Sequence, residues 1–369
     1  MGILGSNGKT TTSALTWTAF SNAGFNPSLF IGAKLKEVNA GVFVNDNHKV
    51  CIVESDESDA SHSKICINHA IVTSIDHDHL EFYDGSFEKL RQSFIVTLER
   101  IITQHNGFIV ANIDCKEVRS VVMDLRSKHP NYSKLITYSL NDTNTDFVCE
   151  NFVTTQNSFS TNVDIVVRGT DRHNVALPMV GKCNISNMLG AIGMLSAFGG
   201  KIDNSLFSTF TGLDKRFSIL LNNESLTVID DYAHNPAKIQ ALISATLCCY
   251  DADNVFYAIE PHKYSRVSML YDEYLSCYSG AKNIVMMDIF GVQGVGSDSF
   301  GVTKEALCSD IVANNTNINL ANITNDNAID HMLNLVENNK HKILIVFCGA
   351  GHSSSYANKF VDKLRNRPR

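Results

Sequence analysis

The sequence predicts an α/β protein of two domains, each built around a β-sheet that is mainly parallel. Three observations support this prediction. Short runs of apolar and β-branched residues alternate with amphipathic stretches, as in strands joined by crossover helices. Polar residues directly follow many of these runs, and ligands of open α/β sheets bind at the carboxyl ends of the strands. A glycine-rich turn followed by Lys-Thr comes near the start of the chain, where a strand should meet a helix.

Seven strands are expected from the apolar runs, and they span 50–53, 70–73, 108–111, 226–229, 254–259, 283–287 and 342–347. A helix is expected from about Ile185 to Phe198. Residues 130–175 are rich in Asn, Ser and Thr and alternate in polarity, which favours antiparallel strands or long loops attached to the first domain. A new series of strands and helices follows residues 211–217. We therefore expect a first domain of residues 1–213 and a second of residues 214–369.

The composition is that of a globular protein. The 369 residues are 44% hydrophobic and 19% charged, with a net charge of −7 and no evident basic surface for nucleic acid. No apolar run approaches the roughly 18 residues of a membrane span, and the N-terminus carries no basic-then-apolar signal segment. Ten cysteines are scattered without a C-x-x-C spacing, which indicates reduced thiols. We expect a cytoplasmic protein that binds neither nucleic acid nor membranes.

The glycine-rich turn is typical of a loop that binds nucleotide phosphates. Its backbone N–H groups and helix dipole would face the anion, its lysine would neutralise it, and its threonine would ligate magnesium. The spacing fits the short pattern Gly-x-x-Gly-Lys-Thr, because Ile3 stands where the longer pattern requires glycine. An ordinary turn before a surface lysine is the alternative. The residues assigned to nucleotide binding are Gly5, Ser6, Asn7, Gly8, Lys9, Thr10 and Thr11.

Two polar clusters after predicted strands are candidates for metal binding. Glu54 begins the run Glu-Ser-Asp-Glu-Ser-Asp, whose four carboxylates repel one another unless water or a cation intervenes. With a phosphate loop in the same domain, Glu54 is expected to share Mg²⁺ with Thr10, and a solvated acidic loop is the alternative. The second cluster, Asp-His-Asp-His at 76–79, could ligate a metal, orient a phosphate, or lie on the surface without a function.

Further candidates lie where helices are expected to start. Asn184 and Asn187 could cap their helix or present amides to a purine. In the second domain, residues 230–236 (Asp-Asp-Tyr-Ala-His-Asn-Pro) and 260–266 (Glu-Pro-His-Lys-Tyr-Ser-Arg) each follow a strand and enter a helix. That arrangement suits a carboxylate or a phosphate, and Arg266 could hold a small carboxylate with two hydrogen bonds.

In their order and approximate spacing these motifs resemble the Mur ligase family, and the resemblance covers residues 1–369 almost continuously. The similarity is greatest to the alanine-adding members. It implies an ATP-dependent amide ligase of peptidoglycan synthesis, with a central P-loop ATPase domain and a C-terminal Rossmann-like domain that binds the amino acid. In the implied reaction the carboxylate of UDP-N-acetylmuramate attacks the γ-phosphate of ATP, and the amine of L-alanine then displaces phosphate from the acyl phosphate.

The resemblance also implies residue roles. Lys9 would bridge the β- and γ-phosphates of ATP. The other assigned residues are His79 and Arg216 for catalysis; Thr10, Glu54 and His79 for two Mg²⁺ ions; Asn184 and Asn187 for adenine; Asp231 and Arg216 for ATP; and Tyr232, His234, His262 and Arg266 for L-alanine.

Several positions depart from the family pattern, and they are conservative or peripheral. Ser74, Cys183, Lys215 and Asn235 stand where Asn, His, Arg and a second His are usual. The largest departure is a missing domain. Members of this family carry an N-terminal domain that grips the UDP group, whereas here only residues 1–4 precede the phosphate loop. We hypothesise that the gene product starts further upstream, or that a separate chain supplies this domain.

Three other functions fit part of the sequence. A recycling ligase that joins UDP-N-acetylmuramate to a preformed peptide is disfavoured by residues 261–266, which match the alanine-specific pattern. A folylpolyglutamate-type ligase shares the ATPase domain but should lack the motifs at 230–236 and 261–266. A non-catalytic nucleotide-binding fragment would bind ATP without forming an amide.

Overall fold

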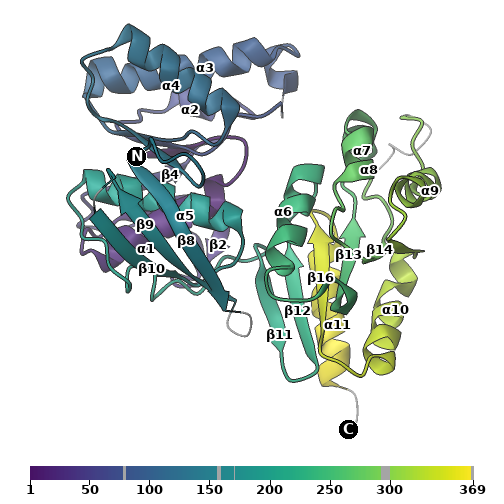
Figure 1. Cartoon of the computed structure of the whole chain (residues 1–369). Coiled ribbons are helices and arrows are strands. Elements are labelled where there is room, and N and C mark those ends of the chain that lie inside the picture. Colours follow the sequence, from purple (N-terminus) through teal and green to yellow (C-terminus); the bar gives the residue numbers. More distant parts are fainter. Residues whose placement is uncertain (78–79, 156–158, 170, 292–299, 367–369) are drawn as a thin grey trace. The chain divides into compact units, whose positions relative to one another are not determined.

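Each of the two parts of the chain is built on its own β-sheet. The computed structural model describes all residues except 78–79, 156–158, 170, 292–299 and 367–369. It divides into two units, Met1–Leu213 and Asp214–Arg369, and both have the expected α/β architecture (Figure 1).

Among the described residues of the first unit, ten strands form one mixed sheet. Their order across the sheet is β10 (Asp171–Leu177), β9 (Ser160–Val167), β8 (Phe147–Thr155), β7 (Leu135–Ser139), β6 (Ile109–Asn112), β5 (Ala70–Val72), β1 (Gly2–Leu4), β4 (Cys51–Glu54), β2 (Ser28–Leu35) and β3 (Ala40–Phe43). Strands β8 to β2 run parallel, while β9, β10 and β3 are antiparallel to their neighbours. Because β1 lies between β4 and β5, the residues that follow these strands surround the phosphate loop.

Helices cover both faces of this sheet (Figure 1). On one face lie α1 (Lys9–Asn22) and α5 (Lys182–Ala197), whose buried side chains share a core with strands as distant as β2 and β10. On the other face lie α3 (Phe87–Arg100) and α4 (Lys116–Lys128). Shorter elements are α2 (Ser61–Lys64), η1 (Leu80–Tyr83) and η2 (Ile101–His105).

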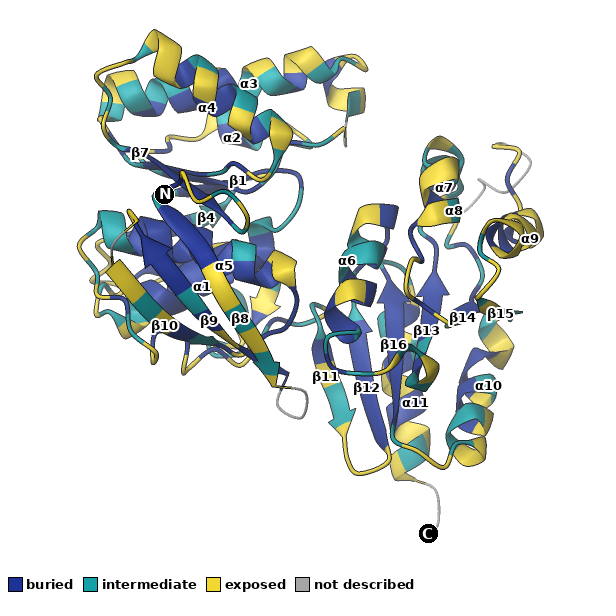
Figure 2. Cartoon of the chain, in the orientation of Figure 1, coloured by how far each residue is buried: buried dark blue, intermediate teal, exposed yellow. Residues whose placement is uncertain are grey.

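The described residues of the second unit form a six-stranded sheet. Its order is β11 (Ser218–Asn222), β12 (Leu226–Asp231), β16 (Ile343–Gly349), β13 (Val255–Glu260), β14 (Asn283–Met286) and β15 (Asn319–Asn322), and only β11 is antiparallel. Every residue of β16 is buried, and Figure 2 shows β12, β13 and β16 as the dark centre of the sheet. The residues that follow these three parallel strands therefore meet at one edge.

The helices of the second unit are α6 (Pro236–Thr246), η4 (Ala252–Asn254), α7 (Tyr264–Met269), α8 (Tyr271–Ser276), α9 (Lys304–Asn314), α10 (Asn325–Asn338) and α11 (Ser353–Arg365). Helices α10 and α11 pack against the face of the sheet that carries Ala258. Since successive strand residues face opposite sides, Tyr257 points to the other face, where its hydroxyl bonds Thr246 of α6 at 2.7 Å.

The structure confirms the expected fold class and each of the seven expected strands. The helix expected from about Ile185 is α5, which begins three residues earlier, at Lys182. In the Asn-rich stretch the expected antiparallel pairing joins β9 to β8 and to β10, whereas β7 is parallel to both β6 and β8. Of the helices in the described part of the chain, none combines the length and the apolar character that crossing a membrane requires.

Candidate active site

Two glycines give the phosphate loop its shape. Gly5 and Gly8 have φ angles of 130° and 83°, which favour glycine. A Cβ on Gly5 would lie 2.3 Å from Oγ1 of Thr73, and one on Gly8 would lie 2.5 Å from Oδ1 of Asn187. The loop is therefore packed between the end of β5 and helix α5. The loop leads into α1, whose N-cap is Gly8. Because no side-chain cap bond occupies the N–H groups of the first helical turn, these groups are available to an anion.

The middle of the loop is bonded to the segment that follows β5. The backbone N–H of Ser6 donates to the carbonyl of Ser74 at 2.9 Å, and the N–H of Asp76 donates to Oγ of Ser6 at 2.9 Å. Asn7 donates from its backbone to Oγ of Ser74 at 2.9 Å and from Nδ2 to Asp76 at 2.7 Å. Ser74, one of the departures from the family pattern, thus supports the phosphate loop.

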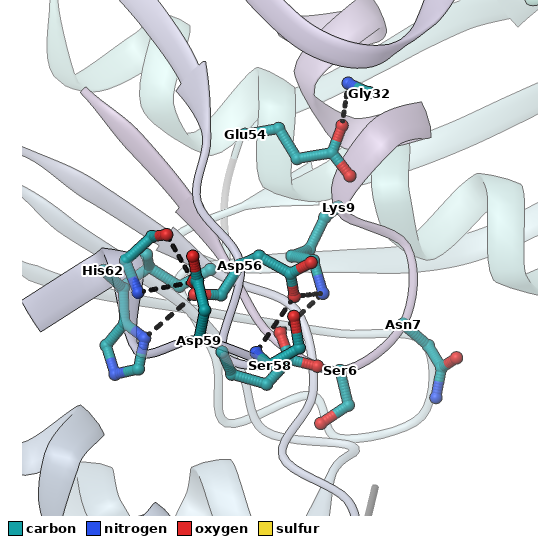
Figure 3. A network of polar contacts seen from close by, with 12 residues as sticks. Ser6, Asn7, Lys9, Gly32, Glu54, Asp56, Ser58, Asp59 and His62 are labelled. Carbon is teal, nitrogen blue, oxygen red and sulfur yellow. Dashed lines mark hydrogen bonds and ion pairs between the residues drawn. The ribbon is translucent and has the colours of Figure 1, made fainter. Parts of the chain in front are cut away.

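The ammonium of Lys9 is held by two carboxylates of the acidic run. Nζ lies 2.6 Å from Oε2 of Glu57 and 3.4 Å from Oδ1 of Asp56; Figure 3 shows Lys9 beside Asp56. Burial opposes the charge of Lys9, but the two carboxylates outweigh it and raise the lysine pKa. Burial likewise opposes ionisation of Asp56, but Lys9 and local hydrogen bonds bring that pKa to about 2. Sequence reasoning proposed the first carboxylate of the run and missed these two.

Thr10 and Glu54 lie together, as the sequence predicts. Oγ1 of Thr10 donates to Oε1 of Glu54 at 2.7 Å, while Oε2 accepts from the N–H of Gly32 at 2.8 Å. A hydroxyl and a carboxylate beside a phosphate loop fit Mg²⁺, which usually takes one or two protein ligands and completes its shell with phosphates and water. Within the described residues no group of three or more His, Cys, Asp or Glu side chains is arranged to hold a metal.

The predicted second metal ligand, His79, lies outside the described residues. His77, two residues earlier, stacks on the ring of Phe87 with centroids 3.9 Å apart. The roles of His79 in catalysis and in metal binding stay predictions.

Several buried polar atoms near the phosphate loop lack a partner. Among the described residues these include Oδ1 of Asn7, Oγ of Ser55 and Oε1 of Glu57. Leaving such groups unbonded is costly, so their presence at one edge of the sheet supports a site for a polar ligand.

The two asparagines at the start of α5 do not cap it. The N-cap of the helix is Gly181, and no side-chain cap bond forms there. Asn184 donates from Nδ2 to the carbonyl of Val180 at 2.8 Å, and Asn187 accepts from Oγ1 of Thr12 at 3.1 Å. Asn187 therefore borders the phosphate loop, and the contact of both residues with adenine remains a prediction.

In the second unit the segments around Arg216 and Asp231 meet. The carboxylate of Asp231 accepts from the N–H of Phe217 at 2.7 Å and of Ala233 at 2.8 Å. The guanidinium of Arg216 lies 4.8 Å from the ring centroid of Tyr232, a cation–π distance. Burial raises the pKa of Asp231 even though Arg216 opposes the shift. The three residues assigned from the sequence are thus neighbours within this unit.

The four residues assigned to L-alanine also come together. The ring of His234 lies 4.9 Å from that of Tyr232 and 5.7 Å from that of His262. Nη1 of Arg266 lies 3.3 Å from Nδ1 of His262. Burial lowers the pKa of His234 to about 3 and that of His262 to about 4, so both imidazoles are neutral near pH 7.

The structure adds residues at this edge that sequence reasoning did not assign. Phe290 stacks on His262 with centroids 5.1 Å apart, and His352 meets Phe290 edge-on at 5.1 Å. Glu260 is 1% exposed and accepts from the backbone N–H groups of residues 351–353 at 3.0–3.1 Å. Phe290 follows a short strand without any motif of its own, so only the fold reveals its position.

Asn235, a departure from the family pattern, caps α6 by accepting from Lys238 N at 3.0 Å.

A phosphate loop at the centre of a mainly parallel sheet defines the first unit as a nucleotide-binding domain of the α/β class. Residues 3–195 match the Mur ligase middle domain, and residues 215–351 match the Mur ligase glutamate ligase domain. The chain belongs to the Mur ligase family, as the motifs predict.

Relatives of known name match nearly the whole chain. The UDP-N-acetylmuramate–L-alanine ligase of Rickettsia felis is 31% identical over 380 residues, which cover 99% of this chain and 75% of that protein. The protein of the same name from Rhodospirillum rubrum is 30% identical over 377 residues, covering 98% and 73%. The crystal structure of UDP-N-acetylmuramate–alanine ligase from Thermotoga maritima superposes with a TM-score of 0.77 at 19% identity, covering 99% of this chain and 75% of that one. This last likeness shows the shared fold.

Proposed function

We propose that this protein joins L-alanine to UDP-N-acetylmuramate with cleavage of ATP to ADP and phosphate, a step of peptidoglycan synthesis. The observation that carries the proposal is the Thr10–Glu54 pair, 2.7 Å apart beside the phosphate loop, which suits magnesium and ATP. The choice of substrates is supported by the names of the relatives from Rickettsia felis and Rhodospirillum rubrum.

In the first half of the proposed reaction, a carboxylate oxygen of UDP-N-acetylmuramate attacks the γ-phosphorus of ATP. The bond to the bridging oxygen of ADP breaks, and an acyl phosphate forms. Lys9 neutralises charge on the β- and γ-phosphates, and the N–H groups at the start of α1 orient them. Bound Mg²⁺, held by Thr10 and Glu54, supplies further charge neutralisation at the phosphates.

In the second half, the ammonium of L-alanine first loses a proton to solvent. The resulting amine attacks the acyl carbon, and inorganic phosphate leaves from the tetrahedral intermediate while the nitrogen gives up its second proton to solvent. Arg266 is the candidate partner of the alanine carboxylate, because a guanidinium binds a carboxylate with two parallel hydrogen bonds. The neutral rings of His234 and His262 do not repel the alanine ammonium. Arg216 and Asp231 are proposed to contact ATP, and Tyr232 to line the alanine pocket.

The test is release of phosphate from ATP by the purified protein with Mg²⁺, UDP-N-acetylmuramate and L-alanine. Each substrate is omitted in turn, and the amide product is identified by mass. Because the matched relatives are longer than this chain, the assay is repeated after adding, as a separate polypeptide, the part of the Rickettsia felis relative that this chain does not match. Phosphate release and amide formation that require both substrates support the proposal.

Two outcomes overturn it. Amide formation with a preformed peptide but not with L-alanine would assign the protein to the recycling reaction. ATP binding without amide formation under every condition would make the protein a non-catalytic nucleotide binder.

A further inference from the structure

Glu57 is the most deeply buried carboxylate beside the phosphate loop, and the reaction described above gives it no role. Its side chain is 1% exposed, and its Oε2 lies 2.6 Å from Nζ of Lys9. Its other oxygen, Oε1, is buried without a hydrogen-bond partner. A carboxylate in such a place is stable only while a cation stays beside it. Lys9 is that cation in this structure.

The loop that carries Glu57 is anchored more firmly than the lysine side chain. The hydroxyl of Tyr83 donates to the carbonyl of Glu57 at 2.7 Å, and the N–H of Ala60 donates to the same carbonyl at 3.1 Å. His62, which is fully buried, bonds Oγ of Ser93 at 3.0 Å through its Nε2. Lysine carries its ammonium on a flexible four-carbon stem. When a ligand competes for the ion pair, Lys9 is therefore the partner that moves.

The pair bears directly on nucleotide binding. Lys9 is the residue assigned to the β- and γ-phosphates, and a phosphate that approaches it meets an ammonium already bound to Glu57. The nucleotide must either draw Lys9 away from Glu57 or share the ammonium with it. In addition, the buried negative charge of Glu57 repels the negative charge of the phosphates. Both effects weaken binding of the nucleotide ground state.

We propose that Glu57 is a positioning residue for the phosphate-loop lysine, which it holds at the loop in the free protein and shares with the phosphates of ATP when the nucleotide is bound. The inference rests on the proposed function, in that it takes the loop to bind ATP. Its consequence is that Glu57 lowers the affinity for ATP while it keeps Lys9 aligned for the reaction.

The test is the affinity for Mg·ATP of the protein and of Glu57→Gln, measured by titration calorimetry at one ionic strength. Glutamine keeps the shape and an acceptor oxygen but removes the charge. We expect the variant to bind ATP about tenfold more tightly, by relief of a close charge. We also expect its turnover to fall, because Lys9 is no longer held by an ionic bond. Damage to the fold would weaken binding and turnover together, so tighter binding is not a structural effect.

Two controls isolate the contact. Asp59→Asn removes the same charge from an exposed position of the same loop, where the carboxylate bonds Ser61, and should leave the affinity unchanged. In a Lys9→Met background the part of the gain that comes from releasing Lys9 should disappear, so the factor gained from Glu57→Gln should differ from the factor in the unaltered protein, because the two substitutions are coupled through one ion pair. If thermal unfolding shows that Glu57→Gln does not fold, Asp56→Asn replaces it. That substitution removes the ion pair between Lys9 and Asp56, which is longer at 3.4 Å, and should tighten ATP binding by a smaller factor.

The failures are distinguishable. If the unaltered protein does not bind Mg·ATP, the proposed function fails. If it binds ATP and Glu57→Gln binds equally or more weakly, or if the gain persists unchanged without Lys9, the role of Glu57 fails and the proposed function stands.

Discussion

Asn187 of α5 packs directly against Gly8 of the phosphate loop, with its side-chain oxygen 2.5 Å from the point where a Cβ on Gly8 would lie. The same oxygen accepts a hydrogen bond from Thr12, so it also joins α5 to α1. The residue assigned to adenine therefore also borders the loop that is assigned to the phosphates. Changes on either side of this contact should affect both parts of the nucleotide site.

Substitution Gly8→Ala tests this contact. The added methyl group would collide with Asn187 and shift the loop, so we expect turnover to fall about a hundredfold or more. Gly24→Ala is the matched control, because Gly24 has a similar φ of 81° and no atom lies within 4 Å of the added Cβ. The control should lose about 1–2 kcal/mol of stability from backbone strain and keep its turnover. Equal effects of the two substitutions on turnover would argue against a role for the Asn187 contact.

Thr10→Val tests the magnesium site. The substitution keeps the shape of the side chain and removes the hydroxyl that bonds Glu54. We expect the Mg²⁺ concentration for half-maximal activity to rise about tenfold or more, while the fold is kept. Thr16→Val is the control, since the Thr16 hydroxyl is buried in the same helix and donates to the carbonyl of Thr12 at 2.7 Å, away from Glu54. An unchanged magnesium requirement in Thr10→Val would remove Thr10 from the metal site.

Arg266→Gln tests the alanine pocket. Loss of the guanidinium should raise the KM for L-alanine by about tenfold to a hundredfold, the usual effect of removing a charged hydrogen-bond donor. The KM for ATP should change little. Lys282→Gln in the same unit removes an exposed ion pair with Asp253 and should alter neither constant. Parallel increases in both KM values would place Arg266 outside the alanine pocket.

The stability of the protein should fall as the pH is lowered from 7 to 5, in part because of His234. Burial lowers the pKa of this group to about 3, below its usual 6.5, so the unfolded chain takes up a proton that the folded protein does not. The contribution of His234 is thus present above pH 6.5 and lost as the pH falls, by on the order of 2 kcal/mol at pH 5. We expect His234→Gln to reduce the loss of unfolding free energy between pH 7 and pH 5. A variant of the exposed His341 should not, and an identical slope in both variants would refute the assignment.

Strands with a strong local pattern could be predicted from the sequence. The run at 343–347, Ile-Leu-Ile-Val-Phe, becomes the fully buried β16, because a strand covered on both faces is apolar throughout. By contrast, β2 contains a glycine and a lysine and lies near an edge, so its pattern was too weak to identify. Local sequence determines the first case, whereas the second depends on pairing with β3 and β4.

The same distinction applies to the site. The phosphate loop and the Thr10–Glu54 pair follow from motifs whose chemistry is known. The Lys9–Glu57 ion pair joins residues 48 positions apart and exists only because β4 lies beside β1 in the sheet. No spacing rule distinguishes Glu57 from the other acidic residues of its run. Which carboxylate meets the lysine depends on tertiary structure.

The order of the strands has a consequence for biosynthesis. In the first unit the central strand β1 is made first and can recruit β4 and β5 as they emerge from the ribosome. In the second unit β16 separates β12 from β13, yet it is translated more than eighty residues after both. Until then β12 and β13 lack the neighbour that each needs, and their apolar edges stay open to chaperones or to aggregation. While it is being made, the second unit is thus the more vulnerable of the two.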